Sequence, residues 1–229
     1  MVEELQTRHL KLSEVAKMLD ITATEAFRQL QRLTDAGLLE KTSEGKYRST
    51  PYSKLILESS AAMDFLSKHR EYFLTHDTSL IPTQFRARFG ELSKAVLSTE
   101  MVSNINTGTE VLRNAERRID VMADQRLEQH GEIIRQHLLR DGIRVRTLVQ
   151  ESLVESIKGD LITVDLAEIR YIPRICATII MTDKSAGFAL KRSDGLMDYQ
   201  VFVCDDPDSK RWVGDLFEQQ WDMAKTLRL

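Results

Sequence analysis

The sequence is poor in cysteine and has no long apolar run. Its 229 residues include two cysteines, Cys176 and Cys204, and each lies inside a short apolar run. Buried structural thiols fit that placement better than a redox or metal-binding role. No apolar run approaches the roughly 20 residues that a membrane helix requires, and no secretory signal peptide is recognisable. We therefore expect a soluble cytoplasmic protein without a membrane partner.

The sequence also lacks an excess of basic residues, because its net charge is −3. No global positive field therefore indicates nucleic acid, although DNA-binding proteins with a large acidic sensor domain are often neutral overall. An apolar content of 42% and a charged content of 29% are ordinary for a globular protein. The length suits one large domain or two smaller ones.

Two short helical patterns meet at a tight turn near the start of the chain. Apolar residues repeat at helical spacing from Leu12 to Leu19, and Ser13 is the expected helix cap. Asp20-Ile21 is the expected turn, with the isoleucine as its apolar plug. The preceding residues, 1–10, look like the tail of a helix, so we expect a truncated N-terminus.

The second helical pattern is specified at both ends. Thr22 is the expected cap, with Glu25 three residues later, and this spacing is a capping box. Gly37 supplies the left-handed residue of a Schellman ending, and two short strands then pair around residues 43–46. Helix, turn, capped helix, glycine stop and hairpin in this order predict a winged helix-turn-helix. The second helix of such a module enters the DNA major groove.

This second helix has an apolar face and a polar face. The apolar positions, which we expect in the core, are Ala23, Ala26, Phe27, Leu30 and Leu33. The candidates for contacts with base edges are Arg28, Gln29, Gln31 and Arg32. The candidates for phosphate contacts are Ser13, Thr22 and Thr24 on the helices and Lys41, Lys46 and Arg48 on the hairpin. The alternative for this face is a solvated polar helix.

One such module would bind DNA weakly, because residues 22–48 carry five basic against four acidic side chains. A homodimer on two half-sites of double-stranded DNA is therefore expected. A long helix, roughly 51–74, begins at Thr50-Pro51 and is a candidate for the dimer seam. The seam positions are Leu55, Ser59, Ala62, Leu66, His69 and Phe73. The alternative is a helix packed on its own domain.

From residue 92 onward strands and helices alternate, which predicts an α/β layer fold. The expected strands are 118–123, 143–149, 169–172, 177–182, 187–190 and 200–203, and the expected helices are 132–140 and 208–227. Small molecules usually bind beyond the carboxyl ends of strands in such folds. The candidate ligand residues at strand ends are Asp124, Gln125, Asp183 and Lys184. Three arginines are candidates either for an anion or for pairing with surface carboxylates: Arg144, Arg146 and Arg170.

Short segments along nearly the whole chain carry a family resemblance. They are 12–19, 30–33, 36–39, 67–77, 89–92, 118–122 and 216–221, of which 67–77 and 216–221 are the more specific. In these segments the chain resembles archaeal winged-helix regulators with a middle domain named for a methanogenesis regulatory protein. The resemblance implies an archaeal source and transcriptional regulation. For the second half it implies a phospholipase-D-like α/β fold, similar to the effector domain of TrmB regulators.

Phospholipase-D chemistry requires a histidine nucleophile in a His-x-Lys-x4-Asp motif. Only His9 has a lysine two residues later, and Ala16 stands at the aspartate position of that match. The sequence has no Gly-rich phosphate loop and no Ser nucleophile elbow. His130 and His137 belong to no metal-ligand pattern. We therefore predict no enzyme activity, no metal and no cofactor.

These patterns together predict three parts: a winged helix-turn-helix domain at 1–52, a connector and dimerisation helix at 53–80, and an α/β effector-sensing domain at 81–229. The predicted function is a homodimeric transcriptional regulator. Its C-terminal domain would sense a small molecule and set the geometry of the two recognition helices. The alternative is a protein-interaction module of the transcription machinery with little direct DNA binding, which the near-neutral charge permits.

Overall fold

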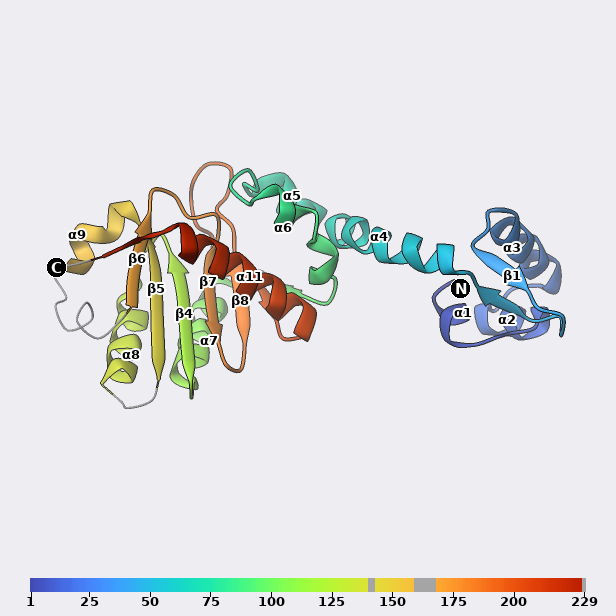
Figure 1. The fold of residues 1–229 in the computed structure, drawn as a ribbon, viewed down its shortest axis with the longest axis horizontal. Helices are drawn as coiled ribbons and strands as arrows, with labels where there is room; N and C mark the ends of the chain where they lie inside the picture. The colour runs from blue at the N-terminus through green and yellow to red at the C-terminus, as the bar shows by residue number, and fades with distance from the viewer. Residues whose placement is uncertain (140–142, 159–167, 228–229) are drawn as a thin grey trace. The chain divides into compact units, whose positions relative to one another are not determined.

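The computed structural model describes residues 1–139, 143–158 and 168–227 (Figure 1). The chain divides into two compact units, Met1–Met63 and Asp64–Leu229. The boundary between them falls inside one helix, α4 (Pro51–Lys68), and the division into three parts stays a prediction. The expected helix end at residues 140–142 lies outside the described residues.

The N-terminal unit is a small helical body closed by a two-stranded hairpin. Its elements are α1 (Glu4–Thr7), α2 (Leu12–Leu19), α3 (Ala23–Asp35), β1 (Leu39–Lys41), β2 (Tyr47–Ser49) and the first part of α4. The two strands pair antiparallel, with Glu40 opposite Arg48. Its core consists of Leu5, Val15, Leu30, Leu39 and Tyr47. The expected sequence of two helices, a turn and a hairpin is therefore present at the expected residues.

Local signals fix both ends of α3. Thr22 Oγ1 accepts the Glu25 backbone N–H at 3.2 Å. The Glu25 carboxylate accepts a hydrogen bond from the Gln29 side chain, one turn further along the helix, and not from the Thr22 backbone N–H. The capping box is therefore half formed. Gly37 has φ +70°, and the Leu38 N–H donates to the Leu33 carbonyl at 2.9 Å, as in a Schellman motif. Glycine is required there because other residues rarely adopt a positive φ.

Two expectations about this unit are wrong. Ser13 does not cap α2, since Lys11 is at the N-cap and its backbone N–H donates to the carboxylate three residues later at 2.7 Å. Phe27 does not lie in the core, because 51% of its surface is exposed. At about 100° per residue it is rotated away from the buried Ala26 and toward the polar face of α3. Ala23 is exposed as well.

The long helix predicted for the connector is broken at His69. The backbone of His69 has φ −109° and ψ 28°, which is not helical. α4 therefore ends at Lys68, and α5 (Arg70–Thr75) follows. The rings of Phe65, His69 and Phe73 pack on one another and on Phe202 within the C-terminal unit. The prediction of one continuous helix is therefore wrong. In this part the alternative, packing on the same domain, is correct.

The C-terminal unit is built on a mixed sheet. Its described strands are β3 (Val96–Ser98), β4 (Arg118–Ala123), β5 (Arg144–Gln150), β6 (Glu168–Ile172), β7 (Thr178–Thr182), β8 (Ala186–Ala189), β9 (Val201–Cys204) and β10 (Lys225–Thr226). The strand order is β10-β6-β5-β4-β7-β8-β9-β3. β6, β5 and β4 run parallel, and the other neighbours pair antiparallel. The expected strands agree within one residue at each end, whereas β3 and β10 are additions.

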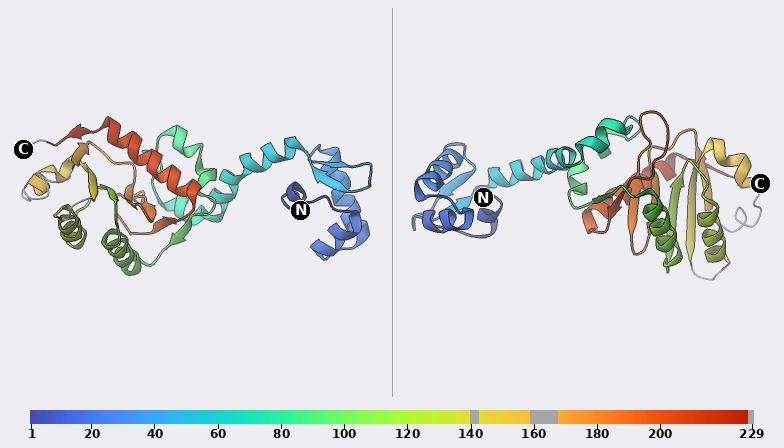
Figure 2. Two further views of the ribbon diagram at one scale, coloured as in Figure 1. Left: turned by 60° about the horizontal axis from the view of Figure 1, so that its bottom comes forward. Right: turned by 180° about the vertical axis from the view of Figure 1, so that it is seen from behind.

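Helices cover both faces of this sheet (Figure 2). α7 (Met101–Arg113) and α8 (Glu128–Leu138) cover one face, and α11 (Pro207–Met223) covers the other. The remaining short helical segments among the described residues are α6 (Thr83–Arg86), η1 (Phe89–Leu92), η2 (Glu151–Leu153) and α9 (Val154–Lys158). α8 begins earlier than predicted, and α11 ends before residue 227 because β10 follows it. None of the described helices is long and apolar enough to cross a membrane.

Candidate nucleic-acid interface and effector site

Arg28 and Arg32 lie one turn apart on the exposed face of α3. Within the described residues neither guanidinium has an ion pair or a hydrogen bond. Thr24 shares this face, and the exposed Phe27 lies beside it. A guanidinium without an intramolecular partner can bridge the O6 and N7 atoms of guanine. The two arginines selected from the sequence are therefore available to a partner outside the chain.

The two glutamines of this face are less available. Gln29 Nε2 donates to Glu25 Oε1 at 2.6 Å, and Gln31 Nε2 donates to Asp35 Oδ1 at 2.8 Å. Each bond joins side chains four residues apart, which are neighbours on a helix surface. An amide that reads adenine uses both its oxygen and its nitrogen, so each glutamine would first have to leave its carboxylate. We therefore rank Arg28 above both glutamines as a base-reading candidate.

The three hydroxyl residues expected at phosphates differ in their state. Ser13 and Thr24 are exposed, and their side chains make no hydrogen bond to any described residue. The hydroxyl of Thr22 accepts the N-terminal hydrogen bond of α3. Ser13 and Thr24 lie in first helical turns, where backbone N–H groups attract anions. Both can therefore still reach a phosphate, whereas Thr22 mainly shapes the helix.

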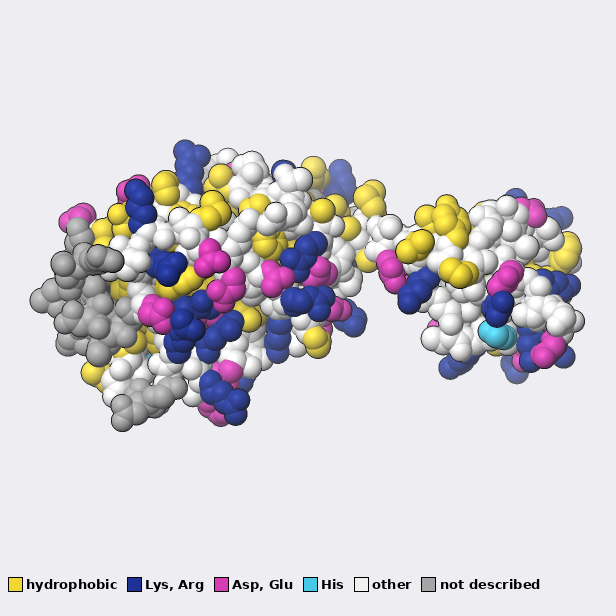
Figure 3. Space-filling model, viewed as in Figure 1, with side chains coloured by type: hydrophobic (Ala, Val, Ile, Leu, Met, Phe, Trp, Pro, Cys, Tyr) yellow, Lys and Arg dark blue, Asp and Glu magenta, His cyan; other side chains and the backbone are white. Residues whose placement is uncertain are grey.

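The hairpin partly neutralises its own basic residues. Lys46 Nζ lies 3.0 Å from Glu44 Oε2, and Arg48 Nε lies 2.6 Å from Glu40 Oε1. The hydrogen bond and the charge of Lys46 lower the pKa of Glu44. Lys41 lies over an aromatic ring of the same hairpin. Side chains of both signs are interspersed on the face of this unit that Figure 3 shows. Because surface ion pairs are weak, a phosphate can compete for the hairpin cations.

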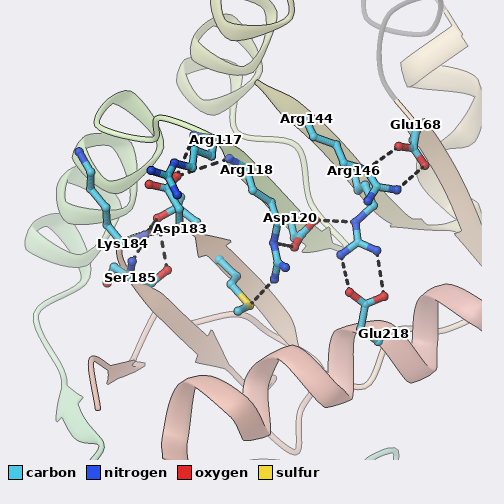
Figure 4. Close-up of polar contacts among 12 residues, drawn as sticks. Arg117, Arg118, Asp120, Arg144, Arg146, Glu168, Asp183, Lys184, Ser185 and Glu218 are labelled. Atoms are coloured by element: carbon cyan, nitrogen blue, oxygen red, sulfur yellow. Dashed lines mark hydrogen bonds and ion pairs between the residues drawn. The ribbon is translucent and has the colours of Figure 1, made fainter. Parts of the chain in front are cut away.

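On the α11 side of the sheet, the carboxylates of Asp120 and Glu218 point toward Arg146 (Figure 4), and aromatic rings of α11 lie beside its guanidinium. Its Nε donates to Asp120 Oδ1 at 2.7 Å, and its terminal nitrogens donate to Glu218 at 2.6 and 2.9 Å. Asp120 is fully buried and also pairs with Arg118. The guanidinium carbon lies 4.9 Å from the centre of the Phe217 ring. Burial alone would lower the pKa of Arg146, but the hydrogen bonds to the two carboxylates outweigh it and raise the pKa.

The other two candidate arginines are also engaged. Arg144 Nε donates to Glu168 Oε1 at 2.8 Å on the surface. Arg170 donates to the Trp221 carbonyl at 2.8 Å, and its guanidinium carbon lies 4.6 Å from the centre of that indole ring. Pairing with nearby groups, the alternative that the sequence left open, thus accounts for all three arginines.

Asp183 and Lys184 lie at the opposite end of the sheet from Asp124 and Gln125, because β7 runs antiparallel to β4. Asp183 Oδ1 accepts the successive backbone N–H groups of residues 116–118 at 3.0 to 3.4 Å. Burial opposes ionisation, but these bonds prevail and lower the pKa of Asp183. Lys184 pairs with a glutamate of that segment. Both side chains therefore have a role in holding the start of β4 (Figure 4).

Asp124 and Gln125 do come together, in the wall of a cavity of about 130 Å³ between α7 and the sheet. The buried Asp124 carboxylate pairs with Lys191 and accepts the Thr178 hydroxyl at 3.3 Å. Gln125 Oε1 accepts the Tyr199 hydroxyl at 2.8 Å. The five other candidate ligand residues do not line this cavity.

No protein-family model matches the chain, and no curated protein matches it. Among solved structures, TrmBL2, an archaeal chromatin protein whose structure is described as showing a novel mode of DNA binding, is 14% identical. That match covers 96% of this chain and 88% of TrmBL2, with a TM-score of 0.46. The phospholipase D family member Nuc from Salmonella typhimurium is 12% identical over 59% of this chain and 97% of Nuc, with a TM-score of 0.46. NucT from Helicobacter pylori is 10% identical over 58% of this chain and 98% of NucT, with a TM-score of 0.47.

The cavity contains residues that sequence reasoning missed. The sequence assigned His130 to no site, but its Nε2 is buried and has no hydrogen bond of ordinary geometry within the described residues. Burial lowers the pKa of His130, and a weak contact with the Ile105 carbonyl opposes that shift. Tyr199 has φ +58°, which no local signal in the sequence indicates. Gly108, in the middle of α7, is the one signal available, since an interior helix glycine often indicates close approach.

Proposed function

We propose that the chain is a DNA-binding transcriptional regulator that inserts α3 into the major groove. One observation carries this proposal: Arg28 and Arg32 lack partners among the described residues, on the exposed face of a helix whose two ends are fixed. A rigid helix presents the two guanidinium groups at constant spacing, which direct reading of base edges requires. The hairpin cations then supply phosphate contacts that set the register.

We further propose that the regulator is a homodimer joined through α4. Four large apolar side chains, Tyr52, Leu55, Ile56 and Met63, recur on one face of this helix. Between 41% and 66% of each is exposed. Exposed large apolar side chains that recur along one helix face favour an interface. Two copies of α4 packed along this face would bring two α3 helices to the half-sites of one DNA duplex.

The proposed effector response uses residues 190–199, which contact both α5 and the cavity. The Leu190 N–H donates to the Tyr72 hydroxyl at 2.8 Å. Just after α5, His76 Nε2 lies 3.3 Å from Asp198 Oδ1. Tyr199 of the same segment lines the cavity. A ligand that displaces this segment would weaken its hold on α5, which continues directly from α4 along the chain. Differential contacts of this kind are what a ligand needs to shift an equilibrium.

The experiment begins with selection of binding sites from random DNA, followed by a salt-resolved binding titration of single variants of the full chain. Arg28→Ala should relax base preference at one position of each half-site, which corresponds to about 1–3 kcal/mol of lost discrimination. Lys46→Ala should weaken binding to all sequences alike and reduce the salt slope by about 0.9 per protomer.

Lys94→Ala is the matched control, since Lys94 is an exposed lysine of the C-terminal unit. It should leave both the base preference and the salt slope unchanged. Unchanged affinity in both Arg28→Ala and Lys46→Ala would contradict the proposed DNA binding.

The exposed Phe27 favours a second candidate, a module that binds another protein of the transcription machinery. An exposed aromatic ring on α3 suits a protein interface, although it can also contact a thymine methyl group. Phe27→Ala separates the two candidates. Loss of a stoichiometric protein partner, with no salt-dependent DNA binding in the unmodified chain, would favour the second one.

A further inference from the structure

The cavity between α7 and the sheet is kept open by small residues on its walls. Gly108 contributes no side chain from α7, and Ala123, Ala186 and Ala189 contribute only methyl groups from the strands. A Cβ atom on Gly108 would lie 3.2 Å from the Ile180 side chain and 3.5 Å from the His130 ring. Protein interiors are otherwise close-packed. A space of this size with a mostly apolar lining is a candidate binding site for a small molecule.

Charged groups at the cavity are already compensated. The Asp124 carboxylate pairs with Lys191 and accepts the Thr178 hydroxyl. The Asn104 amide donates to the carbonyls of Ser98 and Tyr199 at 2.9 and 2.8 Å. A charged ligand would therefore find no opposite charge free to receive it, and its own desolvation would remain uncompensated.

A buried ring nitrogen of His130 contributes to the wall. His130 Nε2 has no hydrogen bond of ordinary geometry among the described residues, and buried polar atoms in native proteins normally have a partner. A neutral imidazole can donate or accept one bond at this atom, depending on its tautomer. The cavity thus combines a mostly apolar wall with a buried hydrogen-bonding atom at His130.

We propose that this cavity is a binding site for a small uncharged molecule with an apolar ring or chain and one hydrogen-bonding group, which His130 receives. A volume of about 130 Å³ is close to the roughly 150 Å³ of an apolar protein cavity that holds benzene. Tyr199 and Met197 belong to the wall contributed by residues 190–199. The regulatory meaning of the site rests on the proposed function, because those residues also contact α5.

The test measures binding of three probes to the full chain by calorimetry and ligand-observed NMR in the absence of DNA. The probes are phenol, which has the proposed chemistry, toluene, which lacks the polar group, and benzoate, which carries a charge. Saturable binding in the order phenol, toluene, benzoate is expected. Absence of saturable phenol binding, or benzoate binding as tight as that of phenol, would overturn the proposal.

Two variants locate the probe. Gly108→Leu should fill the cavity and reduce phenol affinity by at least about tenfold, whereas Asn106→Leu, at an exposed position of the same helix outside the cavity, should change it little. His130→Leu should instead lower phenol affinity about tenfold while toluene affinity is kept, because a hydrogen-bonding site discriminates strongly against analogues that lack the bond.

Unchanged phenol affinity in His130→Leu would refute the proposed role of His130 even if Gly108→Leu failed to fold. The readout contains no DNA. A failure of phenol to bind would therefore overturn the proposed ligand class and would not affect the proposed DNA binding. A failure of the chain to bind DNA would likewise not affect the phenol result.

Discussion

Replacing Arg146 by methionine should destabilise the C-terminal unit strongly. The substitution keeps an unbranched apolar stem, although a shorter one, and removes the guanidinium that pairs with Asp120 and Glu218. Asp120 is fully buried and would keep only the ion pair with Arg118. Breaking a buried pair by removing one partner costs about 3–5 kcal/mol. For a unit of this size that corresponds to a fall in Tm of about 6–20 °C.

The natural assay is equilibrium unfolding followed by tryptophan fluorescence. Both tryptophans of the chain, Trp212 and Trp221, lie in α11, so this signal reports on the C-terminal unit alone. The matched control is Arg144→Met, which removes an exposed pair with Glu168. Exposed pairs contribute about 0–1 kcal/mol, so the control should lower Tm by only a few degrees.

A double variant decides between a structural pair and an anion site. Asp120→Leu combined with Arg146→Met removes both buried charges, so it should be more stable than Arg146→Met alone. If the single variant lost less than about 1 kcal/mol, Arg146 would not be the structural partner that its contacts indicate. The same conclusion would follow if sulfate stabilised the unmodified protein and failed to stabilise Arg146→Met.

Three further predictions concern other parts of the chain. Burial raises the pKa of Cys176 and Cys204 to about 12, so iodoacetamide should label them slowly at pH 8, and the free energy of unfolding should fall as pH rises from about 9 to 12. Asp198→Ala leaves the buried His76 ring without its carboxylate partner and should cost about 1–3 kcal/mol by tryptophan fluorescence. The double substitution of Leu55 and Met63 by glutamate should give a monomer by light scattering, because it places charges on the exposed apolar face of α4.

Each of these has a result that would contradict it. Alkylation of the folded protein at the rate found in denaturant would mean that the thiols are accessible. For Asp198→Ala, hydrogen exchange should rise in α5 and in residues 190–199 together, and a rise in neither would argue against the contact. A dimer of unchanged strength after both glutamate substitutions would place the interface elsewhere than on α4.

Features specified by neighbouring residues could be predicted from the sequence. The ends of α3 follow from Thr22 and Gly37, whose effects reach only three or four residues along the chain. β4 occupies the residues expected for it because a short, mainly apolar segment is typical of a buried strand, although it contains Asp120. Among the candidate DNA contacts, the sequence identified Arg28 and Arg32, yet it could not show that Gln29 and Gln31 are tied to carboxylates.

Features that depend on distant residues could not be predicted. Arg146 lies on a strand of alternating pattern, and its partner Glu218 is 72 residues away on α11. Asp183 lies far from Asp124 because β7 runs antiparallel to β4. The alternation of side chains along a strand does not depend on the direction of the strand, so the sequence could not indicate this. His69 interrupts the connector because its ring packs beside Phe202, a contact across more than half the chain. The cavity is a further case, since it is defined by small residues on several elements.

The two ends of the strand order have a consequence for behaviour at high concentration. The outermost strands are brief, with two residues in β10 and three in β3. A long bare edge offers unpaired backbone groups to a neighbouring chain and promotes fibrous aggregation, which short edges limit. Without β10, the five-residue β6 would become such an edge, carrying the apolar Ile169 and Ile172. The pairing of the two-residue β10 with β6 therefore limits aggregation through the edge of the sheet.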